Sequence, residues 1–258
     1  MPIFLDTGSL KEIEKYLKMG IIRGVTTNPT ILLKDGVIGG IKGVRARSIE
    51  IARLIDPLPL SVEVCTNDPL QMQSQAQELA AMSPNINVKI TIHGPNGELQ
   101  NLEIIHELEV QRNIRVNATA MMSAQQCLVA AMAGATYVSL FAGRVANMGY
   151  NPCEEITRLR KVLDSFNLKA KIIIGSTREV LNIIEWLDAG AHFVTVVPNL
   201  LEGMIVHPYS KETVRQFLAD AAKIESLMEA KPLFSPEKRN SNKEETIVAP
   251  PKLKLVKQ

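Results

Sequence analysis

Short runs of β-branched and aliphatic residues alternate along the chain with amphipathic segments of helical period. We predict strands at residues 2–5, 22–26, 60–64, 86–90, 114–118, 136–140, 171–174 and 192–196. Eight strands separated by helices across residues 1–230 predict a (β/α)₈ TIM barrel. The alternative is a doubly wound open sheet, because periodicity does not show closure. That fold needs a glycine-rich phosphate loop after the first strand, and Asp6-Thr7-Gly8-Ser9 is not one.

Capping residues mark the boundaries of the predicted helices. Asp68-Pro69 supplies an N-cap followed by a first-turn proline, and Ser123 with Gln126 forms a capping-box pattern. Further boundaries are expected at Gly134, Asn151-Pro152, Thr177 and Gly190.

The end of the chain differs in composition from the rest. A final helix is expected over 210–230, and residues 231–258 then carry four prolines, seven Lys or Arg and three Glu. This composition predicts a disordered, solvated tail, although a basic segment could also bind an anionic partner. We therefore predict a barrel domain at 1–230 and a C-terminal tail at 231–258.

Composition is typical of a globular enzyme. Apolar residues make up 46% and charged residues 22% of 258, while aromatics are only 4%, so aliphatic residues must fill the interior. That suits a parallel sheet buried on both faces. The net charge of +2 argues neither for nor against nucleic acid, and we expect no nucleic-acid partner.

The N-terminus and the cysteines bear on location. No basic segment precedes the short apolar run at residues 3–5, and no apolar stretch approaches the length of a membrane span, so neither a signal peptide nor a membrane partner is expected. Cys65, Cys127 and Cys153 lack metal-ligand spacing and are odd in number, which favours reduced thiols in a cytoplasmic protein.

Polar residues interrupt seven consecutive predicted strands near their carboxyl ends, where TIM barrels carry their chemistry. In chain order they are Asp6, Asn28, Glu63, Lys89, Asn117 with Thr119, Ser139 followed by Arg144, and Ser176 with Arg178. Asn117 and Thr119 are two residues apart and therefore share a face, as do Ser139 and Phe141.

Lys89 is the only ionisable residue of its strand. It could be structural, either extending outward to solvent or pairing with a carboxylate. If it points inward among apolar neighbours, burial disfavours the ammonium and makes a neutral amine available to attack a ketose carbonyl. The resulting iminium would accept electrons and permit cleavage of the adjacent carbon–carbon bond.

Three further groups suit proton transfer. Asp6 could act as a general base, or it could be a helix N-cap, a role for which Ser9 is equally placed. Glu63 lies in an otherwise apolar strand, where a lone buried carboxylate is costly. Glu63 and Thr119 could together hold a water during Schiff-base formation.

Ser176 and Arg178 lie at a strand-to-helix junction, which offers a hydroxyl, backbone N–H groups and a guanidinium to a phosphate. Arg144 could add a second positive group. Each arginine alone could equally be a surface charge, but the pair on adjacent barrel loops favours a phosphorylated substrate. The histidines show no metal-ligand spacing, so we propose no metal site.

These residues resemble the transaldolase family, in particular the short-chain transaldolases and fructose-6-phosphate aldolases. The likeness runs from Pro2 to about residue 222. It is carried by Phe4-Leu5-Asp6-Thr7, Gly24-Val25-Thr26-Thr27-Asn28-Pro29-Thr30, Val62-Glu63-Val64, Val88-Lys89-Ile90, Asn117-x-Thr119, Ala133-Gly134-Ala135-Thr136-Tyr137-Val138-Ser139, Phe141-x-Gly143-Arg144, Ser176-x-Arg178 and His207-Pro208.

The resemblance implies a role for each residue. Lys89 matches the Schiff-base lysine and Asp6 the acid/base, while Glu63 and Thr119 match the groups that hold the catalytic water. Hydroxyl-binding positions correspond to Asn28, Asn117 and Ser139, and phosphate ligands to Arg144, Ser176 and Arg178. The implied reaction transfers a dihydroxyacetone unit between sugar phosphates without metal or organic cofactor. Pentamers or decamers, with the last helix packed on a neighbour, are also implied.

Two positions separate the branches of the family. The aldolases carry Gln where this chain has Glu63, and Tyr where it has Phe141, so both positions resemble transaldolase. Thr91 and Leu140 replace usual prolines, which leaves substrate preference open. The alternatives to a pentose-phosphate transaldolase are a dihydroxyacetone-releasing aldolase, a specialised enzyme of another sugar pathway, and a non-catalytic phosphosugar-binding protein on the same barrel.

Overall fold

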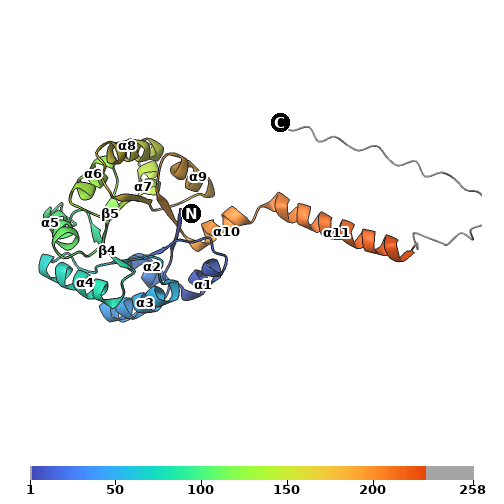
Figure 1. Ribbon diagram of the computed structural model, residues 1–258, viewed down its shortest axis with the longest axis horizontal. Helices are drawn as coiled ribbons and strands as arrows, with labels where there is room; N and C mark the ends of the chain where they lie inside the picture. The colour runs from blue at the N-terminus through green and yellow to red at the C-terminus, as the bar shows by residue number, and fades with distance from the viewer. Residues whose placement is uncertain (1, 231–258) are drawn as a thin grey trace, which may run out of the picture. The chain divides into compact units, whose positions relative to one another are not determined.

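Eight parallel strands form a closed barrel in the computed structural model, which describes residues 2–230 (Figure 1). The strands are β1 (Ile3–Asp6), β2 (Val25–Thr26), β3 (Leu60–Glu63), β4 (Ile86–Thr91), β5 (Val116–Met121), β6 (Tyr137–Leu140), β7 (Lys171–Ile174) and β8 (Phe193–Val196). They neighbour one another in chain order, and β1 pairs with β8 to close the ring. The predicted TIM barrel is confirmed, and the open-sheet alternative is wrong.

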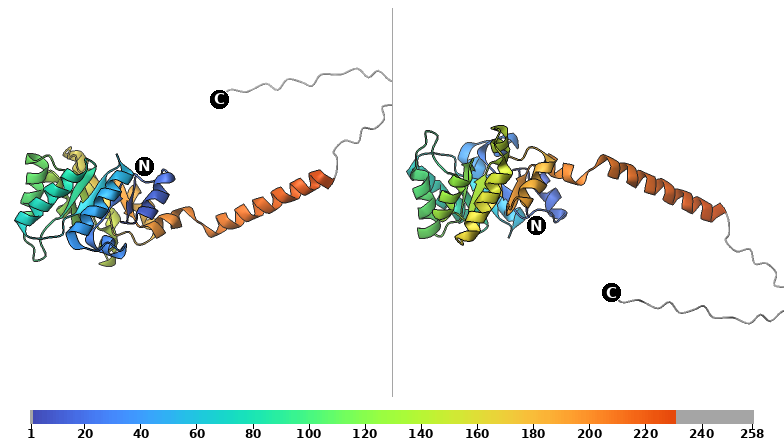
Figure 2. Two further views of the ribbon diagram at one scale, coloured as in Figure 1. Left: turned by 90° about the horizontal axis from the view of Figure 1, so that it is seen from below. Right: turned by 90° about the horizontal axis from the view of Figure 1, so that it is seen from above.

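Helices follow the strands and surround the barrel, as the two side views also show (Figure 2). They are α1 (Leu10–Lys18), α2 (Pro29–Lys34), α3 (Gly40–Ile55), α4 (Pro69–Met82), α5 (Gln100–His106) with a π-helical turn (Glu107–Gln111), α6 (Ala124–Met132), α7 (Ala142–Asn147), α8 (Pro152–Ser165), α9 (Val180–Asp188) and α10 (Pro198–Ile205). Strand–helix–strand connections of this kind produce a parallel sheet covered on its outer face.

The predicted helix starts are confirmed where a side chain caps the helix. Asp68 accepts from the N–H of Gln71, and Ser123 accepts from that of Gln126. The Gln126 side chain in turn accepts from the backbone N–H of Met122, which completes a reciprocal cap. Thr177 does not cap a helix, because α9 begins at Val180 and the Thr177 hydroxyl donates to the carbonyl oxygen of Thr195.

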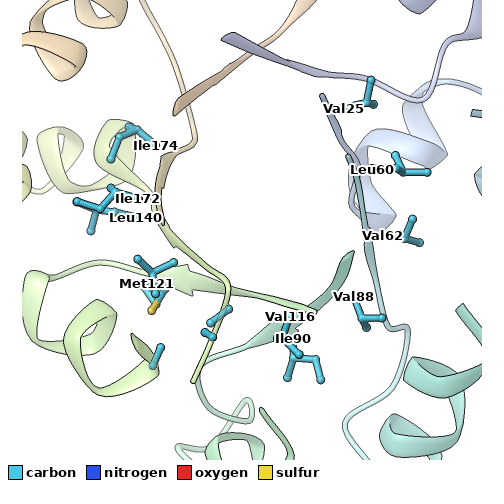
Figure 3. Close-up of a cluster of buried hydrophobic side chains, with 14 of the residues drawn as sticks. Val25, Leu60, Val62, Val88, Ile90, Val116, Met121, Leu140, Ile172 and Ile174 are labelled. Carbon is cyan, nitrogen blue, oxygen red and sulfur yellow. The ribbon is translucent and has the colours of Figure 1, made fainter. Parts of the chain in front are cut away.

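The two faces of the barrel wall have different chemistry. The outward side chains of the strands are aliphatic and pack beneath the helices, as for Val62, Val88 and Ile90 (Figure 3). Alternation therefore turns Lys89 into the barrel. At the opposite end of the interior, Phe4, Tyr137 and Phe193 meet with ring centroids 4.7–6.3 Å apart. These three rings close part of the barrel interior below the site.

The contact pattern divides the chain after His207, so the helix α11 (Pro208–Ala230) is described by itself. It confirms the predicted final helix. Its exposed apolar residues recur at helical spacing, at Val214, Phe217, Leu218, Ile224 and Leu227. The predicted disorder of 231–258 lies outside the described residues. No helix among residues 2–230 is long and apolar enough to cross a membrane.

Candidate active site

Lys89 lies inside the barrel near the end of β4 and is only 4% exposed. Its Nζ donates to the carbonyl oxygen of Thr27 at 3.0 Å and lies 3.2 Å from Oε2 of Glu63. The outward orientation considered from the sequence is therefore wrong. Pairing with a carboxylate does occur, and the partner is itself a predicted site residue.

Strand register explains this pairing, because Glu63 and Lys89 are direct neighbours on β3 and β4. At 3.2 Å a proton can pass directly between Oε2 of Glu63 and Nζ of Lys89. The register of the two strands therefore places a proton-transfer partner beside the buried amine.

Asp6 ends β1 and receives a hydrogen bond of 2.6 Å from the Thr26 hydroxyl. Burial raises the pKa of the Asp6 carboxyl, while the Thr26 hydrogen bond and the positive charge of Lys89 oppose the rise. The N-cap of α1 is Ser9, which accepts from the N–H of Glu12. The helix-cap explanation of Asp6 is therefore wrong, because Ser9 caps α1 and the Asp6 carboxyl bonds to Thr26 instead.

Strand β5, which follows β4 in the barrel, contributes Asn117 and Thr119 on its inward face. The Ser139 hydroxyl donates to Asn117 at 2.7 Å, and the amide of Asn117 donates to Ser61 at 3.1 Å. The buried hydroxyl of Thr119 has no hydrogen-bond partner among residues 2–230. A buried hydroxyl without a partner is costly, so this position suits a bound water or substrate group.

Asn28 follows β2 and is half-buried. Its side-chain oxygen caps α2 by accepting from the N–H of Ile31 at 2.9 Å, and Pro29 occupies the first turn. Because the cap uses the oxygen, the amide NH₂ group is the part that can donate to a substrate hydroxyl.

The loops after β6 and β7 touch one another. A methyl group at Gly143 would lie 1.8 Å from the carbonyl oxygen of Ser176 and 3.1 Å from Cγ of Arg178, so only glycine fits there. Ser176 adopts a positive φ of 62°, a conformation that is uncommon outside glycine and that re-aims the loop. The two loops therefore form a single surface.

Two guanidinium groups project from this surface. Arg144 and Arg178 are exposed, and the Arg144 guanidinium lies 5.6 Å from the centroid of the half-buried Phe141 ring. Stacking on an aromatic ring orients the guanidinium without consuming its N–H donors. Ser176 and Arg178 share the loop after β7, and Gly143, the neighbour of Arg144, contacts both of them, so the predicted phosphate residues are brought together.

Sequence reasoning missed several residues of the site. Thr26 and Thr195 contact each other through their hydroxyl oxygens at 2.5 Å beside Asp6, and Ser61 and the Thr27 carbonyl also contact site groups. The signal was available for Thr195, since it is the inward polar residue of an otherwise apolar strand. Within the described residues, no three His, Cys, Asp or Glu side chains gather closely enough to hold a metal ion.

Comparison with known proteins identifies the family. The sequence profile of the family described as Transaldolase/Fructose-6-phosphate aldolase matches residues 3–247. The chain is 37% identical over 220 residues to "Probable transaldolase" of Carboxydothermus hydrogenoformans, covering 85% of this chain and 97% of that protein. It is 35% identical over 226 residues to "Probable transaldolase" of Moorella thermoacetica, covering 88% and 100%.

A solved structure of low identity shows the fold alone. Thiamine phosphate pyrophosphorylase from Pyrococcus furiosus matches with a TM-score of 0.54 and 12% identity, covering 76% of this chain and 85% of that chain. The sequence matches span nearly the whole barrel at 35–37% identity. The chain therefore belongs to the transaldolase/fructose-6-phosphate aldolase family.

Proposed function

We propose that the protein is a transaldolase that moves a dihydroxyacetone unit from a ketose phosphate to an aldose phosphate through a Schiff base on Lys89. The donor would be fructose 6-phosphate or sedoheptulose 7-phosphate. The observation that carries the proposal is the burial of Lys89, which is 4% exposed inside the barrel. Its Nζ lies 3.2 Å from Oε2 of Glu63, and its charge interacts with the Asp6 carboxyl. A structural lysine would not require Asp6 in that position.

The reaction begins at the amine. Neutral Lys89 attacks the ketone carbon, and the carbinolamine loses water to give an iminium. Asp6 takes the proton of the hydroxyl on the carbon that becomes the departing aldehyde. The electrons of the breaking carbon–carbon bond pass into the iminium and leave an enamine on Lys89. The enamine then attacks the acceptor aldehyde, Asp6 returns its proton, and water hydrolyses the new iminium.

The water steps require a group to hold and activate water. We assign this role to Glu63 and Thr119. The unpartnered, buried hydroxyl of Thr119 supports the assignment, since a water there would satisfy it. Glu63 can pass a proton to or from Lys89 directly at 3.2 Å.

Binding of the sugar would use the remaining residues. Asn28, Asn117 and Ser139 would bind hydroxyls of the covalent intermediate, with Phe141 forming part of the pocket wall. Arg144, Ser176 and Arg178 would bind the phosphate, an assignment supported by the contact between their two loops.

An aldolase that releases free dihydroxyacetone is the second candidate. Glu63 and Phe141 count against it, because they match the transaldolase branch. The test is to measure turnover of fructose 6-phosphate with and without erythrose 4-phosphate. Transfer that depends on the acceptor supports the proposal, whereas equal turnover with free dihydroxyacetone as product would favour the aldolase.

Assembly and location are further proposals. The apolar stripe of α11 supports a homo-oligomer, a pentamer or decamer, since exposed apolar helix faces are costly in water. Light scattering after size exclusion tests it, and a monomer at micromolar concentration would contradict it. The cytoplasmic location stays a prediction.

A further inference from the structure

Asp6 lies at one end of a chain of hydroxyl groups that crosses the closure of the barrel. Thr26 on β2 donates to Oδ1 of Asp6 at 2.6 Å, and Oγ1 of Thr26 lies 2.5 Å from Oγ1 of Thr195 on β8. These three residues come from adjacent strands, because β1 lies between β8 and β2. Thr26 and Thr195 are 3% and 6% exposed, so bulk water does not replace these bonds.

The directions of the hydrogen bonds follow from proton counting. An ionised carboxylate only accepts, so the single proton of Thr26 goes to Asp6. Thr26 then has no proton for Thr195, and Thr195 must be the donor in the 2.5 Å contact. The chain of donation runs from Thr195 to Thr26 to Asp6. Each hydroxyl strengthens the next donor, and all of them favour negative charge on Asp6.

A second bond fixes the far end of this chain. Thr177 donates to the carbonyl oxygen of Thr195 at 2.6 Å. Thr177 lies between Ser176 and Arg178, so the same bond ties β8 to the loop after β7. This bond holds the backbone at Thr195 and so fixes the position from which the Thr195 hydroxyl donates.

We propose that Thr26 and Thr195 are positioning residues that orient the Asp6 carboxylate and stabilise its ionised form. The consequence for turnover rests on the proposed function, in which Asp6 is the acid/base, but the effect on ionisation does not. Other charges also act on Asp6. The ammonium of Lys89 favours its ionisation, while Glu63 and Asp35 oppose it.

The competing explanation is that the two hydroxyls only satisfy each other inside the barrel. Replacing Thr26 by Val would then lower stability by one hydrogen bond, whatever the charge on Asp6. In our proposal, Thr26→Val destabilises the charged form of Asp6 more than its neutral form. Titration of Asp6 itself separates the two explanations.

The experiment is an infrared titration of the full chain labelled with ¹³C-carboxyl aspartate, with Asp6 assigned by difference from Asp6→Asn. For Thr26→Val we expect the ionisation constant of Asp6 to fall about tenfold, because a hydrogen bond to a charged group is lost. Thr195→Val should shift it in the same direction by less. Thr26→Ser should restore it, since serine keeps the donor.

The matched control is Thr27→Val. Thr27 is equally buried and neighbours Thr26, but its hydroxyl donates to the backbone of Ser61. Its loss should leave the titration of Asp6 unchanged. An unchanged titration in Thr26→Val, or equal shifts in Thr26→Val and Thr27→Val, would overturn the proposal. If Thr26→Val does not fold, Thr195→Val and Thr26→Ser decide by the same criterion.

The pH dependence of kcat/KM distinguishes a failure of this inference from a failure of the proposed function. In Thr26→Val, the acid limb of kcat/KM should move to higher pH, with kcat lowered more than KM is raised. A shifted Asp6 titration with an unchanged pH–rate profile would support the positioning role but remove Asp6 as the acid/base. An unshifted titration removes the positioning role whatever the rate.

Discussion

Gly143→Ala is predicted to damage phosphate recognition through one steric contact. The added methyl would lie 1.8 Å from the carbonyl oxygen of Ser176 and 3.1 Å from Cγ of Arg178. Carbon and oxygen atoms come no closer than about 3.3 Å without repulsion, so the Ser176 backbone must move by about 1.5 Å. Ser176 already has an uncommon φ of 62°, which leaves it little freedom to adjust.

The size of the effect follows from that displacement. Misplacing a binding group by about 1 Å can lower the rate roughly 100-fold, so we expect kcat/KM for fructose 6-phosphate to fall to that extent. Overpacking should also lower stability by about 1–3 kcal/mol. Unphosphorylated donors should be affected far less, because they do not use this surface.

The assay compares kcat/KM for fructose 6-phosphate and for fructose in the wild type, Gly143→Ala and Gly175→Ala. Gly175, in the neighbouring loop after β7, is the control, since its methyl would lie in ordinary contact, 3.5 Å from Cδ1 of Phe141. Gly175→Ala should retain the preference for phosphate. Equal losses with both sugars in Gly143→Ala, or no loss with either, would refute the proposed role of this surface.

Three further predictions concern other parts of the molecule. Asp6→Asn should stabilise the fold at neutral pH and not near pH 3. Burial raises the pKa of the native carboxyl above its ordinary value of 3.8, so wild-type stability falls as pH rises through the native pKa. Urea unfolding at both pH values measures this, and an advantage confined to low pH would contradict it. Arg178→Ala should chiefly raise KM for phosphorylated sugars, and equal impairment with unphosphorylated sugars would remove its role. Ser123→Ala should lower the free energy of unfolding by about 0.5–2 kcal/mol through loss of the α6 cap, whereas an unchanged urea midpoint would show that the cap contributes nothing.

The sequence predicted the strands and most of the site because both depend on local pattern. Strand alternation puts Lys89 on the face opposite Val88 and Ile90, and the same rule puts Asn117 and Thr119 on one face. Neighbouring strands in a parallel barrel then bring such residues together at one end. Glu63 and Lys89 are direct neighbours through the register of β3 and β4, which periodicity alone does not determine.

What the sequence did not predict depends on contacts between distant segments. The choice between Asp6 and Ser9 as helix cap needed the actual start of α1. The hydrogen bond from Thr26 to Asp6 and its contact with Thr195 join strands that are far apart in the chain, and closure by β1 and β8 creates that neighbourhood. Periodicity gives the face of a side chain but not its partner across the barrel.

In the proposed mechanism, the amine of Lys89 forms the covalent intermediate. Borohydride should reduce the iminium formed with fructose 6-phosphate to a stable secondary amine, which peptide mass spectrometry should locate on Lys89. Lys89→Ala should lose the adduct, and a control at the exposed Lys171, Lys171→Ala, should keep it. An adduct on another lysine, or one that survives in Lys89→Ala, would contradict the account.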